Sequence, residues 1–224
     1  FCNTCGTLQI NYTVPKEIMY NDHTYLSGMN KSMKDHFHSI SSNVINNYLK
    51  NNEGLVVDIG SNDGTLLQTY KNLGMSVLGV EPGEKPSQIA IKNSIPTLKR
   101  FFDYDCSVEI SDLHGKAKVI SAANVFYHVE DLHSIVKGIK FLLDDDGVIA
   151  IQASYLPNLI KNKAFDIMYH EHLLYYRIEN LNYLFNMYDL EIFDYEMAEV
   201  HGGSIIAYAN HRNNRRINKK VDSL

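Results

Sequence analysis

The chain has 224 residues, of which 45% are hydrophobic and 21% are charged, and its formal net charge is −5. This length allows one full α/β domain with a small accessory part, and the composition is ordinary for a soluble globular protein. The negative charge does not favour nucleic-acid binding, and no apolar run reaches the roughly 18 residues of a membrane helix. We therefore expect neither nucleic acid nor a membrane as a partner.

The first thirty residues differ from the rest because they lack long apolar runs and are rich in Tyr, Asn and turn formers. They predict a small irregular module over residues 1–30. Within it, Cys2 and Cys5 form a Cys-x-x-Cys knuckle of the kind that supplies half of a tetrahedral zinc site. The chain has no second such pair, so zinc would need ligands from an upstream segment, and the alternative is two exposed thiols.

The two ends of the chain and its cysteine content suggest where the protein belongs. The chain begins at Phe1 and ends in a polar basic stretch over residues 210–220, for which a solvated tail is expected. We expect a piece of a longer protein. Three cysteines do not make a disulfide framework, which favours the reducing cytoplasm.

Apolar residues recur at three- and four-residue steps over residues 31–49, among them Met33, Phe37 and Ile40. This spacing predicts a helix, and Gly54 is expected to end it in a left-handed conformation.

From residue 55 onward, apolar runs typical of buried strands alternate with helical patterns. We expect strands at residues 55–59, 76–80, 95–98, 118–123 and 147–153, and helices at residues 65–73, 87–93, 132–143 and 178–187. Two further strands, at residues 191–197 and 204–209, are expected near an edge of the sheet. This alternation predicts an α/β fold with a mostly parallel sheet and helices on both faces.

The expected strand at residues 55–59 runs directly into the loop Gly60-Ser61-Asn62-Asp63-Gly64. Gly60 permits a sharp turn, and Gly64 permits close packing of the next helix, whose amino terminus offers free N–H groups. The following strand ends at Glu81, whose carboxylate can accept hydrogen bonds from both hydroxyls of a ribose. The predicted cofactor contacts in this region are Asp58, Gly60, Asn62, Gly64 and Glu81.

Two classes of cofactor use this arrangement. A dinucleotide enzyme carries Gly-x-Gly-x-x-Gly, which brings the backbone close to a pyrophosphate. Here Asp58 and Asp63 would repel a pyrophosphate, whereas they suit the sulfonium and ammonium groups of S-adenosylmethionine. A plain strand–helix turn is the alternative, and the carboxylate of Glu81 argues against it.

The segment over residues 122–132 follows the strand at residues 118–123, so we expect it to overlie the cofactor. Asn124 is expected to contact the methionine part of the cofactor, and His128 is expected to face the substrate. A satisfied loop histidine is the alternative for His128. Asp131 is expected to cap the next helix.

The segment Tyr169-His170-Glu171-His172 is the densest group of proton-transfer residues in the chain. Its histidines are two apart, so it is not the His-Glu-x-x-His zinc motif. Tyr169, Glu171 and His172 suit general acid–base chemistry, with Glu171 able to raise the basicity of an imidazole. A polar surface turn is the alternative. A third polar loop, His201-Gly202-Gly203-Ser204, by itself predicts only a turn.

Taken together, these motifs resemble those of the S-adenosylmethionine-dependent sugar C-methyltransferases that act on nucleotide-linked keto-deoxysugars. The resemblance covers nearly the whole chain, and the segments at residues 169–172 and 201–204 are its most specific part. The matching segments are Cys2-x-x-Cys5-Gly6, Tyr25-Leu26-Ser27-Gly28, Asp58-Ile59-Gly60-Ser61-Asn62-Asp63-Gly64, Gly79-Val80-Glu81-Pro82, Asn124-Val125, His128-Val129-Glu130-Asp131-Leu132, Tyr169-His170-Glu171-His172 and His201-Gly202-Gly203-Ser204.

The resemblance implies a Rossmann-like class I methyltransferase fold for residues 31–200. It implies that residues 1–30 are the remnant of an N-terminal zinc-binding domain. Residues 201–224 would be the start of a truncated C-terminal domain, which in this family helps to hold the nucleotide-sugar. A monomer is expected.

For function, the resemblance implies methyl transfer from S-adenosylmethionine to a carbon next to a ketone of a nucleotide-linked deoxysugar, by way of an enolate. His172 would be the base, Glu171 would orient it, and Tyr169 and His128 would bind or protonate the keto oxygen. One alternative is O- or N-methylation of another small molecule, and a second is an NAD-dependent nucleotide-sugar oxidoreductase or epimerase. A non-catalytic binding module is the third, against which the acid–base residues argue.

Overall fold

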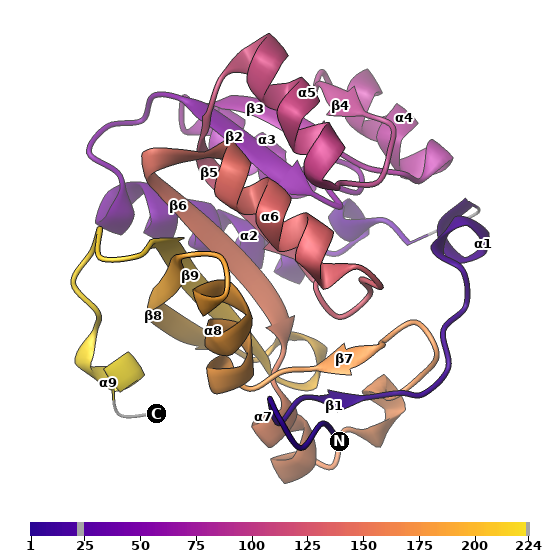
Figure 1. The fold of residues 1–224 in the computed structure, drawn as a ribbon. Coiled ribbons are helices and arrows are strands. Elements are labelled where there is room, and N and C mark those ends of the chain that lie inside the picture. The colour runs from indigo at the N-terminus through magenta and orange to yellow at the C-terminus, as the bar shows by residue number, and fades with distance from the viewer. Residues whose placement is uncertain (22–24, 223–224) are drawn as a thin grey trace.

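The computed structural model describes residues 1–21 and 25–222, and its centre is a seven-stranded sheet in the order β4-β3-β2-β5-β6-β9-β8 (Figure 1). Strands β2 to β6 are parallel to one another, while β9 runs antiparallel to both of its neighbours. The strands are β2 (Leu55–Ile59), β3 (Ser76–Val80), β4 (Thr97–Leu98), β5 (Ala117–Ala123), β6 (Leu143–Ser154), β8 (Leu190–Ala198) and β9 (Ser204–His211).

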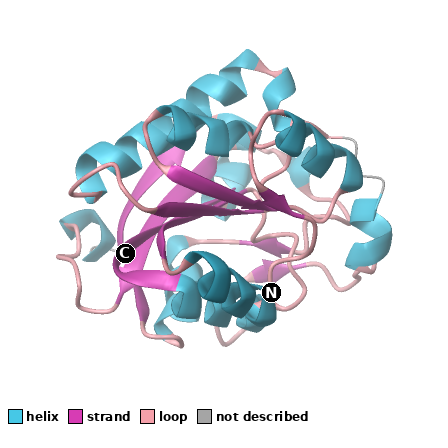
Figure 2. Ribbon diagram, turned by 90° about the horizontal axis from the view of Figure 1, so that it is seen from above, coloured by secondary structure: helices cyan, strands magenta, loops and turns pink. Residues whose placement is uncertain are grey.

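Helices cover both faces of the sheet (Figure 2). One face packs against α2 (Lys31–Asn43), α3 (Thr65–Asn72) and α4 (Glu84–Lys92), and the other against α5 (Tyr104–His114), α6 (Leu132–Leu142) and α8 (Ile178–Asn186). Within β2, Val56 lies in the apolar core on the α2, α3 and α4 side of the sheet. Val57 and Ile59 lie in the core on the α5, α6 and α8 side. Because both faces are buried, the strands read as apolar runs without alternation. The predicted α/β fold with a mostly parallel sheet is confirmed.

The first part of the chain is attached to the rest by a small sheet of its own. Strand β1 (Leu8–Gln9) pairs antiparallel with β7 (Leu174–Tyr175), and the two lie side by side in Figure 1. Beneath them lies a third apolar cluster, built around Leu159 of α7 (Leu156–Lys161). The remaining short helices are α1 (Lys16–Asn21) and α9 (Lys219–Asp222).

The helix predicted over residues 31–49 is present, but Gly54 does not end it. α2 ends at Asn43, a wider helical turn continues to Tyr48, and Leu49 is extended. Gly54 has a φ of +113°, but it lies in the turn that enters β2. A Cβ at this position would come within 2.9 Å of the Lys118 Cβ, so the glycine serves the approach of β2 to β5.

Helix α5 is absent from the sequence prediction because its own residues favour helix only weakly. It contains two serines and the β-branched Val108 and Ile110. Its start is fixed by Asp103, whose Oδ1 accepts the N–H of Cys106 at 2.7 Å. The corresponding cap that the sequence predicted for α6 is confirmed, since Asp131 accepts the N–H of Ser134 at 2.9 Å.

Strand β9 lies inside the main sheet. β8 is the edge strand, as predicted, but β9 is inserted between β6 and β8 and pairs with both. Residues 204–211 are therefore part of the central sheet. The boundaries predicted for the three domains remain predictions of the sequence.

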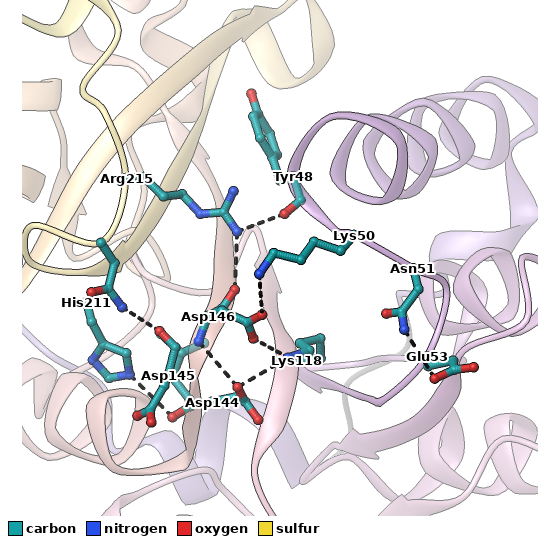
Figure 3. A network of polar contacts seen from close by, with 12 residues as sticks. Tyr48, Lys50, Asn51, Glu53, Lys118, Asp144, Asp145, Asp146, His211 and Arg215 are labelled. Atoms are coloured by element: carbon teal, nitrogen blue, oxygen red, sulfur yellow. Dashed lines mark hydrogen bonds and ion pairs between the residues drawn. The ribbon is translucent and has the colours of Figure 1, made fainter.

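The amino-terminal ends of β5 and β6 are held by a network of charged groups (Figure 3). Lys118 Nζ lies 3.2 Å from Asp144 Oδ1 and also contacts Asp146. Arg215 donates to the carbonyl oxygens of Tyr48, at 2.8 Å, and of Asp146, at 3.2 Å.

Among the residues that the structure describes, no helix combines the length and the apolar character needed to cross a membrane.

Candidate functional site

A cavity of about 500 Å³ opens at the carboxyl ends of β2, β3 and β5. Its walls also include parts of α1 and α2, the segment that follows β5, and residues 167–172. The predicted contact residues that line it are Gly60, Asn62, Glu81, Asn124, His128, Tyr169, Glu171 and His172. Asp58, Gly64, Cys2 and Cys5 are not among the lining residues.

Glu81 holds the β3 end of the cavity. Its Oε2 accepts the N–H of Asn62 at 2.9 Å, and its Oε1 accepts the N–H of Gly83 at 2.7 Å. Burial raises the pKa of Glu81, and these two bonds oppose the rise. Each carboxylate oxygen keeps a second lone pair, so the ribose hydroxyls of a cofactor can still bind there.

Gly60 is required by backbone geometry and by packing. Its φ is +66°, and a Cβ there would come within 2.5 Å of Val125 Cγ2. The loop after β2 therefore packs directly against the segment that follows β5. Gly64 has a φ of +77°, and a Cβ there would lie 3.1 Å from Ile95 Cγ1, so this glycine also allows close packing.

Asp58 lies one layer beneath the cavity. Strand β2 continues to Ile59, so Asp58 is inside the strand and its Oδ1 accepts a hydrogen bond from Ser121 Oγ at 2.7 Å. Burial raises the pKa of Asp58 to about 7, the Ser121 bond lowers it, and the charge of Glu81 raises it further. The expected direct contact of Asp58 with the cofactor is not supported by this placement.

A segment from the first part of the chain closes over the loop after β2. Asn62 Oδ1 accepts the N–H of Ser27 at 2.9 Å, and Asn62 Nδ2 donates to the carbonyl of Tyr25 at 3.0 Å. Asp63 Oδ2 accepts the N–H of Gly28 at 2.8 Å. The side chains of Asn62 and Asp63 thus hold this segment in place. From the sequence, Asp63 was expected to face the cationic groups of the cofactor and Asn62 to contact the cofactor.

The charge of the cavity comes mainly from other residues. Among the described lining residues, the single lysine is Lys16 of α1. The lining carboxylates are Glu81, Asp103, Glu130, Asp131 and Glu171. This excess of negative charge suits a cationic cofactor better than a pyrophosphate.

His172 is the most enclosed imidazole at the other end of the cavity. It is 5% exposed, and its ring centroid lies 4.1 Å from that of Tyr169 and 4.4 Å from that of Tyr127. Burial lowers the pKa of His172 to about 4, the carbonyl of Ile167 opposes this shift, and His201 adds to it. The ring is therefore neutral near pH 7.

Glu171 meets His128 through its backbone. His128 Nδ1 lies 2.7 Å from the Glu171 carbonyl oxygen, and the His128 ring centroid is 5.0 Å from that of His172. The Glu171 carboxylate lies 3.9 Å from His170 Nε2. This placement positions His128 beside His172, whereas the sequence analysis expected the Glu171 side chain to orient His172.

Asn124 is held by a chain of hydrogen bonds that sequence reasoning missed. Its Oδ1 accepts a bond from Gln152 Nε2 at 3.1 Å, and Gln152 Oε1 lies 2.7 Å from His36 Nε2. Gln152 is a buried amide that interrupts the apolar run at residues 148–153 of β6, which is a signal that the sequence offered. His36, on α2, and Tyr20, on α1, gave no such signal.

Cys2 and Cys5 flank a tight turn. The N–H of Gly6 donates to the Cys2 carbonyl at 2.8 Å, and the pKa of the Cys2 thiol is lowered to about 7, chiefly by the backbone N–H of Cys5. Two thiols supply two of the four ligands of a zinc site. Within residues 1–21 and 25–222 no group of three or more His, Cys, Asp or Glu could hold a metal ion. Zinc binding remains a prediction.

A mostly parallel sheet, a glycine turn after one strand and a buried carboxylate after the next are typical of enzymes that bind an adenosine cofactor. The family of methyltransferase domains matches residues 26–195, and the chain belongs to this family. Its cofactor is S-adenosylmethionine, which fits the acidic cavity described above. The alternative of an NAD-dependent oxidoreductase or epimerase is therefore set aside.

The comparisons with individual proteins agree with this family. The chain is 28% identical over 208 residues to the C-methyltransferase NovU of Streptomyces niveus, a match that covers 93% of the chain and 50% of NovU. The chain thus spans about half the length of this curated relative.

Among solved structures, it is similar to magnesium protoporphyrin IX methyltransferase from Synechocystis, determined with bound S-adenosylhomocysteine. That match has a TM-score of 0.61 at 16% identity and covers 88% of this chain and 93% of the other. A methyltransferase from Anabaena variabilis gives a TM-score of 0.58 at 15% identity, covering 86% and 100%. At these identities the likeness shows the fold.

Proposed function

We propose that the domain transfers a methyl group from S-adenosylmethionine to a carbon next to a ketone of a nucleotide-linked deoxysugar. Similarity to a C-methyltransferase over 93% of the chain supports transfer to carbon. The resemblance of the motifs at residues 169–172 and 201–204 to those of the sugar C-methyltransferases supports the substrate class.

The observation that carries the proposal is the neutral, enclosed His172. A hydroxyl or amine acceptor already carries a lone pair, which a base makes more reactive, whereas a carbon next to a ketone has none until a base removes its proton. His172 lies in the cavity wall between two tyrosines, and its Nδ1 is buried with no hydrogen-bond partner among the described residues. A base with an uncommitted nitrogen is what a carbon acid requires.

In the proposed reaction, His172 takes the proton from the carbon next to the ketone. The C–H electron pair moves into the carbon–carbon bond, and the carbonyl oxygen becomes an enolate oxygen. His128 and Tyr169 lie within 5.0 Å and 4.1 Å of the His172 ring, measured between centroids, and can stabilise that oxygen by hydrogen bonds. When bound, S-adenosylmethionine supplies the sulfonium methyl group that the carbon accepts.

The cofactor would lie between Glu81 and Asn124, across the glycine loop. Glu81 would accept hydrogen bonds from the ribose, and Gly60 lets the cofactor approach the backbone closely. Asn124, fixed by Gln152, would face the methionine part. The nucleotide-sugar is the proposed partner, and we propose that the protein is cytoplasmic. We also propose a monomer, and light scattering on the purified protein checks this oligomeric state.

The test is product analysis with a nucleoside-diphosphate keto-deoxysugar and S-adenosylmethionine carrying a ¹³C methyl group. We expect a new carbon–carbon bond in the NMR spectrum of the product and, in D₂O, exchange of the proton next to the ketone. A methyl signal on oxygen or nitrogen would instead support the alternative of O- or N-methylation. Absence of turnover with every keto-sugar nucleotide, while amine or hydroxyl acceptors react, would reject the proposal.

A further inference from the structure

We propose that His201 is an acceptor-binding residue, whose imidazole hydrogen-bonds an oxygen of the methyl acceptor beside His172. This inference rests on the proposed function, because it assumes that the acceptor occupies the histidine-rich end of the cavity. The sequence alone gave His201 no role beyond a turn. Its backbone, its side chain and its place along the sheet each support a role in binding.

The backbone of His201 is held in an uncommon conformation. Its φ of 52° and ψ of 43° are left-handed, and Gly202 and Gly203 follow with φ values of 75° and 114°. A Cβ on Gly202 would lie 3.1 Å from Ala164 Cβ, and one on Gly203 would lie 2.7 Å from Asn158 Cβ. The loop is therefore packed tightly against α7 and the residues after it. Strain of this kind persists where the surrounding structure imposes it, as at binding sites.

The side chain of His201 lines the cavity, and its Nε2 is buried without a hydrogen-bond partner among the described residues. Two other histidines of this region are engaged, since His36 bonds Gln152 and His128 bonds the Glu171 carbonyl. A buried polar nitrogen without a partner costs free energy, so such atoms need an explanation. A ligand oxygen in the cavity supplies the missing partner.

The ring is suited to a neutral or anionic oxygen. Burial lowers the pKa of His201, and the nearby His36 lowers it further, so the ring is neutral near pH 7. A neutral imidazole donates one hydrogen bond and accepts one. It can therefore bind a carbonyl or hydroxyl group of the acceptor and strengthen its bond as negative charge develops on the oxygen.

The position of His201 along the sheet favours the acceptor over the cofactor. Glu81 ends β3, whereas His201 lies just before β9, and β2, β5 and β6 separate these strands. Strands lie about 4.8 Å apart, which places β9 roughly 19 Å from β3 across the sheet. In S-adenosylmethionine a single methylene group joins the ribose to the sulfonium centre. The methyl group is therefore near the ribose end, and His201 lies on the side where an acceptor must enter.

The test compares His201→Ala and His201→Asn in the full-length protein with Asn213→Ala as a control. Asparagine tolerates a left-handed backbone and keeps a side-chain donor, so it separates binding from folding. Asn213 also has a left-handed backbone, with a φ of 65°, and does not line the cavity. The measurements are KM and kcat with a nucleoside-diphosphate keto-deoxysugar, and calorimetric affinity for S-adenosylhomocysteine.

We expect His201→Ala to raise the acceptor KM at least about tenfold, because one good hydrogen bond is lost. The affinity for S-adenosylhomocysteine should change less than twofold. His201→Asn should recover part of the loss, and Asn213→Ala should leave both quantities unchanged. An active wild type with an unchanged KM in His201→Ala, or a loss of S-adenosylhomocysteine affinity in that variant, overturns this inference alone. A wild type that turns over no keto-sugar overturns the proposed function as well.

Discussion

The two ends of the central sheet treat charge in opposite ways. At the amino-terminal ends of β5 and β6, Lys118 is placed between Asp144 and Asp146, and each charge has an opposite charge beside it (Figure 3). At the carboxyl ends, carboxylates outnumber the single lysine among the described lining residues, and His172 Nδ1 and His201 Nε2 have no hydrogen-bond partner among those residues.

This difference separates groups that serve the fold from groups that serve a ligand. Exposed ion pairs are satisfied by one another and by water, so they add little to stability and nothing to binding. Groups enclosed in a cavity without a protein partner carry a cost that a bound ligand or an ordered water removes. The comparison therefore predicts where substitutions should change chemistry and where they should not.

The largest effect is expected at His172. Removing the base should lower kcat by roughly 10²- to 10⁴-fold, because general base catalysis contributes that much, while S-adenosylhomocysteine binds normally. His170→Ala is the matched control, since the His170 side chain is 61% exposed and does not line the cavity. Proton exchange next to the ketone in D₂O should disappear in His172→Ala. If exchange and methyl transfer both survive, His172 is not the base.

Glu81 should give the reverse result, a loss of cofactor binding. In Glu81→Gln one oxygen becomes an NH₂ group, which cannot accept the N–H of Asn62 or of Gly83. We expect S-adenosylhomocysteine to bind about 10- to 100-fold more weakly in calorimetry, since bonds to a charged group contribute about 1.5–3 kcal/mol. Glu84→Gln, at the exposed start of α4, should bind as the wild type does. Equal affinities in both variants would remove Glu81 from the cofactor site.

The pH dependence of stability should distinguish the buried carboxylate from the buried imidazole. The pKa of His172 is lowered to about 4, so the unfolded state takes up its proton first and the stability from this group is lost as pH falls from about 6.5 to 4. The pKa of Asp58 is raised to about 7, so the stability from that group is present below about pH 4 and is lost as pH rises towards 7.

Urea unfolding between pH 5 and pH 7.5 measures both contributions. Asp58→Asn keeps the acceptor for Ser121, and its unfolding free energy should rise by on the order of 2 kcal/mol relative to that of the wild type as pH rises. The unfolding free energy of His172→Ala should rise relative to that of the wild type as pH falls. Parallel curves for all three proteins would show that neither group has a shifted pKa in the folded state.

The smallest effect is expected at the other end of the sheet. Lys118→Met keeps the aliphatic stem but removes the charge between Asp144 and Asp146, whose side chains are 37% and 49% exposed. Water can solvate the two carboxylates, so unfolding free energy should fall by no more than about 1 kcal/mol, and less in high salt. Affinity for S-adenosylhomocysteine should not change. A larger loss, or a loss of binding, would contradict the distinction between the two ends.

Most of the fold could be predicted from the sequence because the strands of the sheet are continuous apolar runs. β2, β3, β5 and β6 were all located within a few residues, since burial on both faces leaves a clear pattern. Helix α5 was missed because capping by Asp103 and packing on α6 outweigh its weak propensity. The tertiary pairing of β1 with β7 joins residues far apart in the chain, which no local pattern indicates.

The site was predictable where a loop ends a strand. The positions of Gly60, Glu81, Asn124 and His128 follow from the rule that the carboxyl ends of parallel strands share one edge. The predicted strand at residues 55–59 already contained Asp58, but no local pattern could tell that its side chain bonds Ser121 of β5 beneath that edge. The sequence also could not find Tyr20, which lines the cavity from α1, or His36, which reaches Gln152 from α2.

The insertion of β9 between β6 and β8 has a consequence for how the chain folds during synthesis. Until residue 211 has emerged from the ribosome, β6 exposes an open edge that carries Ile149, Ile151 and Ala153, all fully buried in the folded chain. Unpaired apolar edges of this kind promote association between chains. The hairpin of β8 and β9 covers this edge, and the turn between its strands brings His201 to the cavity wall. A polypeptide cut at residue 195, where the family match ends, should therefore aggregate rather than fold.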